Sequence, residues 1–160
     1  MRSVLQPGDV GAIVAMHGIL YAREHGFDAT FEAYVAEPLS AFVLRASPRE
    51  RIWVEERNGR LAGCVAIVSA AEDVAQLRWF LVDPSARGTG LGRRLLADAI
   101  AFSRESGYRR IVLWTVAGLA AAQHLYRQAG FTPVEAAPAR RWGVDVVEEK
   151  HQLDLAPLVR

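Results

Sequence analysis

The sequence lacks the features of a secreted, membrane-bound or nucleic-acid-binding protein. It holds a single cysteine, Cys64, so no disulfide can form within the chain, and this predicts a reducing, cytoplasmic location. The formal net charge of +1 gives no overall attraction to nucleic acid or to an anionic membrane, so we expect neither as a partner. No long apolar run follows Met1 and Arg2, and we therefore expect no signal peptide and no membrane span.

The composition is that of an ordinary globular domain. Hydrophobic residues make up 51% of the 160 positions and charged residues 23%, which excludes a disordered chain. There is no internal repeat, no low-complexity tract and no linker. We expect one domain over residues 1–160, long enough to bury a substantial core.

The first 45 residues predict a short strand followed by two helices. Residues 2–5 can form the strand, and Asp9 can cap a helix that ends at Gly26. Asp28 or Thr30 can cap the second helix. Its apolar residues recur at helical spacing, namely Phe31, Tyr34, Val35, Leu39, Phe42 and Val43. Pro38 lies inside this pattern, and we expect it to begin a new turn or to kink the helix.

The next segment predicts three antiparallel strands over residues 51–57, 60–69 and 74–82. Asn58-Gly59 separates the first two, and it is the strongest two-residue hairpin signal. Residues 70–73 form the second turn. The three strands should therefore make a meander.

The second half of the chain predicts two further helices and three strands. A helix from Leu91 to about Gly107 precedes a β-branched run over residues 109–116, so this run should pair in parallel with the 74–82 strand. A short helix over 119–129 follows. The remainder reads as a strand near 132–135, a polar loop from 136 to 145 and a last strand from about 147 to 155. The expected fold class is α/β, with a mixed sheet flanked by helices.

A glycine-rich loop joins the third strand to the helix at Leu91. Gly88, Gly90 and Gly92 remove the β-carbons that would keep a ligand from the backbone, and the first N–H groups of the helix have no partner within it. Arginines at 87, 93 and 94 add positive charge. This arrangement predicts a pyrophosphate site. The glycine spacing fits neither the Gly-x-Gly-x-x-Gly dinucleotide fingerprint nor a Gly-Lys-Ser/Thr nucleotide loop.

Two motifs in the expected structural order resemble those of the GCN5-related N-acetyltransferase (GNAT) family. They are Arg87-x-x-Gly90-x-Gly92 and the segment Leu125-Tyr126-Arg127-Gln128-Ala129-Gly130-Phe131. The resemblance covers essentially the whole chain. Within the family, the chain most resembles the acetyltransferase half of bacterial proteins that join a MarR-type regulator to such a domain. The residues that carry this likeness are His17-Gly18-x-x-Tyr21 with Glu24, Arg78, Leu113-Trp114-Thr115 and Trp142-Gly143-x-Asp145. No DNA-binding portion is present, so we do not transfer that kind of regulation.

The resemblance implies an acetyl-CoA-dependent enzyme. It would transfer acetyl directly, in a ternary complex, to a primary amine of a small molecule, amino acid or peptide. The parallel strands would splay apart to receive the cofactor, and no metal is expected. The implied cofactor-binding residues are Leu81, Val82, Arg87, Gly88, Thr89, Gly90, Leu91, Gly92, Arg93 and Tyr126. The backbone N–H of Val82 would stabilise the oxyanion, and Tyr126 would protonate the departing thiolate.

The resemblance places the acceptor between the first two helices and the loop at Trp142. Its candidate binding residues are His17, Tyr21, Glu24, Arg78 and Trp142. Arg78 would bind an acidic group of the substrate or pair with Glu24. Relatives that acetylate lysine often carry glutamate where this chain has Gln76, which leaves the base unassigned: a water chain to His17, Glu24 or His25 remains possible, as does an amine that arrives neutral.

Several alternatives stay open at this point. Gln76, together with Val116 where relatives often carry asparagine, is compatible with a non-catalytic acyl-CoA-binding sensor of the same fold. A dinucleotide-binding domain is disfavoured by the glycine spacing. The sequence does not identify the acceptor, and it allows a monomer or a homodimer.

Overall fold

The computed structural model describes residues 1–156 and is built around one six-stranded sheet. The strands are β1 (Arg51–Arg57), β2 (Arg60–Ser69), β3 (Val74–Val82), β4 (Arg110–Val116), β5 (Thr132–Arg141) and β6 (Val144–Asp154). Their order across the sheet is β1-β2-β3-β4-β6-β5. All neighbours are antiparallel except β3 and β4, which are parallel. The predicted mixed sheet, with its meander and its parallel pair, is confirmed.

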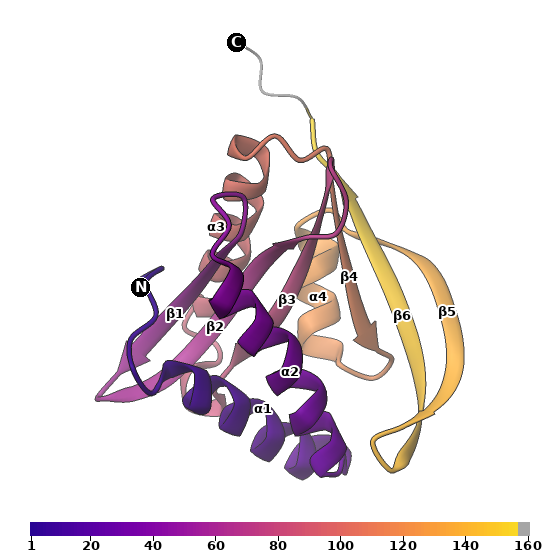
Figure 1. The fold of residues 1–160 in the computed structure, drawn as a ribbon. Helices are drawn as coiled ribbons and strands as arrows, with labels where there is room; N and C mark the ends of the chain where they lie inside the picture. Colours follow the sequence, from indigo (N-terminus) through magenta and orange to yellow (C-terminus); the bar gives the residue numbers. More distant parts are fainter. Residues whose placement is uncertain (157–160) are drawn as a thin grey trace.

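Helices cover both faces of this sheet (Figure 1). They are α1 (Asp9–His25), α2 (Ala29–Arg45), the short 3-10 helix η1 (Pro84–Ala86), α3 (Leu91–Glu105) and α4 (Ala120–Gln128). One buried cluster joins the sheet to α1 and α2, and a second joins it to α3 and α4. Among residues 1–156, no helix has the length and apolar character needed to cross a membrane.

The first part of the chain differs from the prediction in two places. Residues 2–5 do not form a strand: Arg2 makes one isolated bridge to Val54 of β1. Pro38 does not start a new turn, because α2 runs unbroken from Ala29 to Arg45. The Asp28 cap is confirmed, since its side chain accepts a hydrogen bond from the backbone N–H of Thr30 at 2.9 Å.

The largest difference lies near the C-terminal end. The polar loop expected over 136–145 is wrong, because β5 continues to Arg141 and forms a long hairpin with β6. The turn of this hairpin is Trp142-Gly143, with φ of 52° and 82°, as a type I′ turn requires. β5 is an edge strand exposed on nearly every residue. Such a strand has no buried face, so it lacks the alternation by which strands are recognised.

A β-bulge in β3 sets the shape of the sheet centre. Cys64 of β2 pairs with Leu81, but Ala66 pairs with Arg78, so β3 contains one residue more than β2 over this stretch. Trp79 lies in the bulge with φ of +48°, an unusual value for a bulky residue. As a result, Arg78, Trp79 and Leu81 all lie on the α1–α2 side, while Leu77 and Phe80 pack with the α3–α4 cluster.

The parallel strands separate just before this bulge. β3 and β4 pair from Val74–Arg110 to Gln76–Val112 and no further. Beyond Gln76 the two strands diverge, which leaves an opening in the centre of the sheet that we call the split. The splay that the resemblance implied is therefore present.

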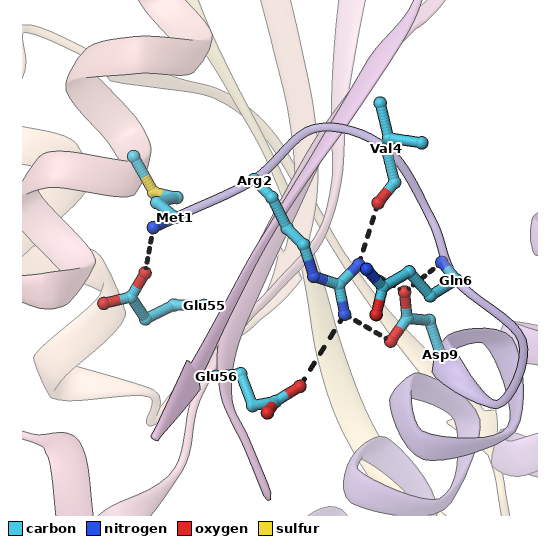
Figure 2. A network of polar contacts seen from close by, with 7 residues as sticks. All are labelled: Met1, Arg2, Val4, Gln6, Asp9, Glu55 and Glu56. Carbon is cyan, nitrogen blue, oxygen red and sulfur yellow. Dashed lines mark hydrogen bonds and ion pairs between the residues drawn. The ribbon is translucent and has the colours of Figure 1, made fainter. Parts of the chain in front are cut away.

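The N-terminal segment is attached to the sheet by a network of charged side chains (Figure 2). Arg2 donates to both carboxylate oxygens of Asp9, at 2.5 and 2.8 Å, and Asp9 also accepts from the N–H of Gln6 at 2.5 Å. The Arg2 backbone makes two hydrogen bonds to Val54, each of 2.9 Å. These contacts connect the start of α1 to the edge of β1.

We predict that Asp9→Asn lowers the free energy of unfolding by about 1 kcal/mol, since it weakens a paired charge and a backbone acceptor. Arg2 lowers the pKa of the Asp9 carboxyl, so this stabilisation is present above the unfolded pKa and is lost as the pH falls through the folded one. Urea unfolding of both proteins at pH 7 and pH 3 measures it. Glu56→Gln, which removes an Arg2 contact of 3.8 Å, is the control and should change little.

Candidate active site

Two cavities meet at the split. The loop cavity, of about 450 Å³, lies between α1, the glycine loop and α4. The inner cavity, of about 130 Å³, lies under α1 and α2 and reaches through the sheet to α4. Four residues line both cavities: Tyr21, Phe80, Leu119 and Ala122. The two cavities are therefore adjacent, with these four residues between them.

The glycine loop forms one wall of the loop cavity. Gly88 and Gly90 have φ of 75° and 81°, a conformation that favours glycine, and α3 begins at Leu91 with its first N–H groups unpaired within the helix. A β-carbon on Gly92 would lie 3.0 Å from Leu125 Cδ1. The loop thus presents open backbone and a helix N-terminus, which suits a phosphate.

Most of the predicted cofactor residues line this cavity. They are Leu81, Val82, Arg87, Gly88, Gly90, Gly92 and Arg93. Three do not. The Thr89 hydroxyl donates to the carbonyl of Ala86 at 2.6 Å, and the Leu91 side chain is buried in the core, so both have structural roles in the loop. The third, Tyr126, lines the inner cavity.

Arg87 is paired with Glu24 of α1, at 2.8 Å between Nη2 and Oε1. Both side chains line the loop cavity. The sequence left open a pair between Glu24 and Arg78, and this expectation is wrong, because Glu24 pairs with Arg87 and lines the loop cavity, whereas Arg78 lines the inner cavity.

The backbone N–H of Val82 points toward the split. In a strand, successive N–H groups point to opposite sides. Asp83 donates to the carbonyl of Ala62 in β2 at 2.8 Å, so the N–H of Val82 points away from β2. The Val82 carbonyl, which points the same way, accepts from Arg87 Nε at 3.3 Å.

Tyr126 projects from α4 into the inner cavity. Its ring is buried and lies 5.9 Å from that of Phe80, measured between centroids. Burial raises the pKa of Tyr126, and the nearby Tyr21 adds to the rise. The phenol is therefore protonated at neutral pH. Tyr126 does not line the loop cavity, but it lies just past the residues that the two cavities share.

His17 and Tyr21 lie one helical turn apart on α1 and face the inner cavity. The Nδ1 of His17 lies 2.8 Å from the carbonyl oxygen of Ile13, and burial lowers the pKa of His17 to about 4. The ring is thus neutral at physiological pH, with Nδ1–H donating to that carbonyl. Burial, with a smaller contribution from Glu24, raises the pKa of Tyr21 to about 12.

Arg78 is the cation of the inner cavity. Its guanidinium lies 5.0 Å from the ring centroid of Trp79, and burial lowers its pKa. Within residues 1–156, no carboxylate and no hydrogen-bond acceptor is among the groups that shift the pKa of Arg78, so its guanidinium has no ion-pair partner there. Half-buried charge without a partner is costly, so this site is suited to an anionic group of a ligand.

Aromatic side chains form the outer wall of the inner cavity. The Trp142 ring lies 4.9 Å from that of Phe27, 5.0 Å from Phe31 and 5.2 Å from Tyr34, measured between centroids. The Trp142 carbonyl also accepts from the N–H of Asp28 at 2.9 Å. The hairpin turn is thereby held against the α1–α2 junction, and Trp142 lines the inner cavity.

Three further residues line the inner cavity. Gln76 and Val116 were noted from the sequence as departures from relatives, and both lie here. Glu148 of β6 was not identified from the sequence. The signal for it was available: Val144, Val146 and Glu148 alternate along one strand face, but the loop predicted to residue 145 hid the start of that strand.

A family model described as "Acetyltransferase (GNAT) family" matches residues 14–131. Among curated relatives, the chain is 37% identical over 86 residues to the mycothiol acetyltransferase of Cellulomonas flavigena, a match that covers 48% of this chain and 25% of that protein. It is 31% identical over 118 residues to an uncharacterized N-acetyltransferase of Schizosaccharomyces pombe, covering 72% of each. This chain thus spans a quarter of the first relative and nearly three quarters of the second.

The fold is also similar to those of solved structures. One is yncA of Salmonella typhimurium, described as a putative acetyltransferase with its cofactor acetyl-CoA. It superposes with a TM-score of 0.78 at 22% identity, over 97% of this chain and 92% of that one.

We predict that His17 stays neutral through the physiological range. NMR titration of the histidine rings should place its midpoint near pH 4, with its signal assigned by comparison with His17→Gln. Because the unfolded chain binds this proton at about pH 6.5, the free energy of unfolding should fall as the pH drops from 6.5 toward 4. A His17 midpoint near 6.5 would contradict the buried, neutral ring.

Proposed function

Because the chain belongs to the acetyltransferase (GNAT) family, a class of acetyl-CoA-dependent acyltransferases, we propose that it transfers acetyl to the primary amine of a small molecule, amino acid or peptide. Transfer is direct, with both substrates bound at once. The observation that carries this proposal is the meeting of the two cavities at the split. One cavity is suited to a pyrophosphate, and the other holds a protonated tyrosine and an unpaired arginine.

In this proposal the loop cavity binds acetyl-CoA, which supplies the acetyl group as a thioester. The backbone of residues 87–93 and the N-terminus of α3 bind the pyrophosphate. Arg87 and Arg93 add charge, and Arg87 exchanges Glu24 for a phosphate oxygen. The unpaired edge of β3 at Leu81 and Val82 receives the amide groups of the pantetheine arm, as an edge strand receives a peptide.

Two groups at the split stabilise the reaction. The Val82 N–H donates to the thioester oxygen as negative charge develops there, and one such donor contributes about 3 kcal/mol. Tyr126 donates its proton toward the sulfur as the carbon–sulfur bond breaks. Its raised pKa keeps it in the protonated state that this role requires.

The inner cavity binds the acceptor. Its outer wall of aromatic rings packs against an apolar body, and Arg78 binds an anionic group. His17 and Tyr21 complete the wall. The His17 ring is neutral and the Tyr21 phenol keeps its proton at neutral pH, so both shape the cavity without changing its charge. The acceptor that fits these features is a primary amine that carries a carboxylate next to an apolar or aromatic group.

A non-catalytic acyl-CoA sensor remains the competing function. Gln76 removes the glutamate that many relatives use, and Val116 removes a polar contact in the inner cavity. A sensor would need the loop cavity but not the phenol of Tyr126. The hydroxyl group of Tyr126 is therefore required for catalysis but not for sensing, and removing it distinguishes the two functions.

We predict that Tyr126→Phe lowers turnover by about 10²-fold or more while acetyl-CoA binding is retained. The ring stays in its packing site, and only the proton donor is lost. Thermal unfolding measures binding: saturation at ~100 times the dissociation constant should add ~2.7 kcal/mol in both proteins, and NAD is the control ligand. A rate equal to that of the wild type would exclude Tyr126 as the acid, and a wild type without turnover would favour the sensor.

We predict that Arg78→Gln removes a preference for acceptors with a carboxylate. L-phenylalanine and phenethylamine form a matched pair that differs only in this group. The wild type should favour L-phenylalanine by about tenfold or more in kcat/KM, since a charge-assisted hydrogen bond contributes ~1.5–3 kcal/mol. In the variant the ratio should approach one. Arg45→Gln, on α2 and outside both cavities, is the control, and an unchanged ratio in Arg78→Gln would assign Arg78 to structure.

A further inference from the structure

Glu148 is the one carboxylate among the described residues that line the inner cavity. It lies on β6, opposite Val116 of β4 and Ala137 of β5. Val144 and Val146, four and two residues before it, pack against the α1–α2 cluster. Because alternate residues of a strand share a face, this places Glu148 on the acceptor side of the sheet.

An ion pair with Arg141 fixes the orientation of the Glu148 carboxylate but leaves some of its hydrogen-bond acceptor positions free. Arg141 Nε lies 2.8 Å from its Oε1, and Arg141 Nη2 lies 3.4 Å from its Oε2. A carboxylate has about four acceptor positions, and the guanidinium takes two of them. The side chain is 25% exposed, so a proton that it receives can pass on to water.

The other groups around the inner cavity are poorer proton acceptors. Protonation of His17 would create a buried cation. Its lowered pKa of about 4 shows that this is unfavourable. Tyr21 and Tyr126 are protonated phenols, and Gln76 is an amide. Glu148, in contrast, loses its charge when it takes a proton, so no new buried charge forms.

We propose that Glu148 is the general base that removes the proton from the ammonium group of the acceptor, directly or through one water molecule. The inference rests on the proposed function of the inner cavity. Arg78 on β3 and Glu148 on β6 then carry opposite charges on two sides of one cavity. This pattern is complementary to a zwitterion, with the carboxylate at Arg78 and the ammonium at Glu148.

The protons balance in this scheme. An ammonium acceptor gives one proton to Glu148, and its nitrogen then bonds to the carbonyl carbon of acetyl-CoA. As the carbon–sulfur bond breaks, the proton of Tyr126 goes to sulfur, and the second proton leaving nitrogen restores the phenol. The net products are the amide, the free thiol and one proton, which Glu148 releases to water.

Several charged or titratable groups surround Glu148. Arg141 of β5 pairs with it, and Lys150 lies two residues along β6 on the same face, 5.6 Å from the Trp114 ring. The other charged or titratable groups lining the cavity are Arg78, His17, Tyr21, Tyr34 and Tyr126. Two cations, Arg141 and Lys150, thus lie on the same side of the sheet as Glu148.

The test is the pH dependence of Glu148→Gln with the best acceptor among L-phenylalanine, L-methionine and phenethylamine. At pH 7 its kcat should be about 10² to 10³ lower than that of the wild type. The deficit should shrink about tenfold per pH unit toward pH 10, because the neutral fraction of an alkylamine grows at that rate below a pKa of about 10. Glu148→Asp, which keeps the carboxylate, should retain part of the activity.

Hydroxylamine is the matched acceptor, because it is uncharged at neutral pH and needs no base. Glu148→Gln should acetylate it at the wild-type rate after subtraction of the uncatalysed reaction of hydroxylamine with acetyl-CoA, and this enzyme-dependent rate also shows that the variant is folded and binds acetyl-CoA. Asp145→Asn removes the neighbouring Arg140 pair of the same hairpin, outside the cavity, and should leave both rates unchanged.

Three results would overturn the assignment of Glu148. They are an unchanged pH profile in Glu148→Gln, a loss of the same size with hydroxylamine, and a loss of the same size and pH dependence in Arg141→Gln, which would indicate a structural ion pair. Failure of the proposed function is distinct from these, since the wild type would then acetylate no primary amine at any pH.

Discussion

The separation of β3 from β4 is the constraint on which the rest of the molecule depends. A parallel pair normally continues along its length, but here it stops at Gln76 and Val112. The bulge at Trp79 accounts for this. It carries a positive φ and an indole N–H that is buried without a hydrogen-bond partner among the described residues. Each of these features costs about 1–3 kcal/mol. The packing of Trp79 on Phe42 and the hydrogen bond from Cys64 Sγ to the Trp79 carbonyl hold the strand in this conformation.

The split matters because it is the passage between the two layers of the protein. Tyr126 belongs to the α3–α4 layer, whereas His17, Arg78 and Trp142 belong to the α1–α2 layer. A continuous sheet would separate these groups completely. The change of face at the bulge also places Arg78 and Trp79 next to each other on one side, which puts a cation in the inner cavity. One inserted residue thus provides both the opening and the charge beside it.

The sequence predicted those parts of the fold that have a local signal. The Asn58-Gly59 turn, the Asp28 cap and the helix after the glycine loop all follow from residues within one turn of one another. The C-terminal hairpin could not be predicted in this way. Its Trp142-Gly143 turn requires a positive φ at tryptophan, which is locally unfavourable, and the contacts with Phe27, Phe31 and Tyr34 stabilise it from more than 100 positions away. Glu148 was missed for the same reason, since its place in the cavity depends on that hairpin.

Access to solvent determines which groups near the split are charged and which are neutral. A group enclosed on all sides, such as His17, is most stable when neutral, and its lowered pKa expresses this. Tyr126 is enclosed as well, and burial raises its pKa so that the phenol keeps its proton at neutral pH. In the proposed reaction, the proton released by acetylation would leave through a more exposed group at the cavity rim. Glu148 provides such a group, on the hairpin that the sequence alone did not reveal.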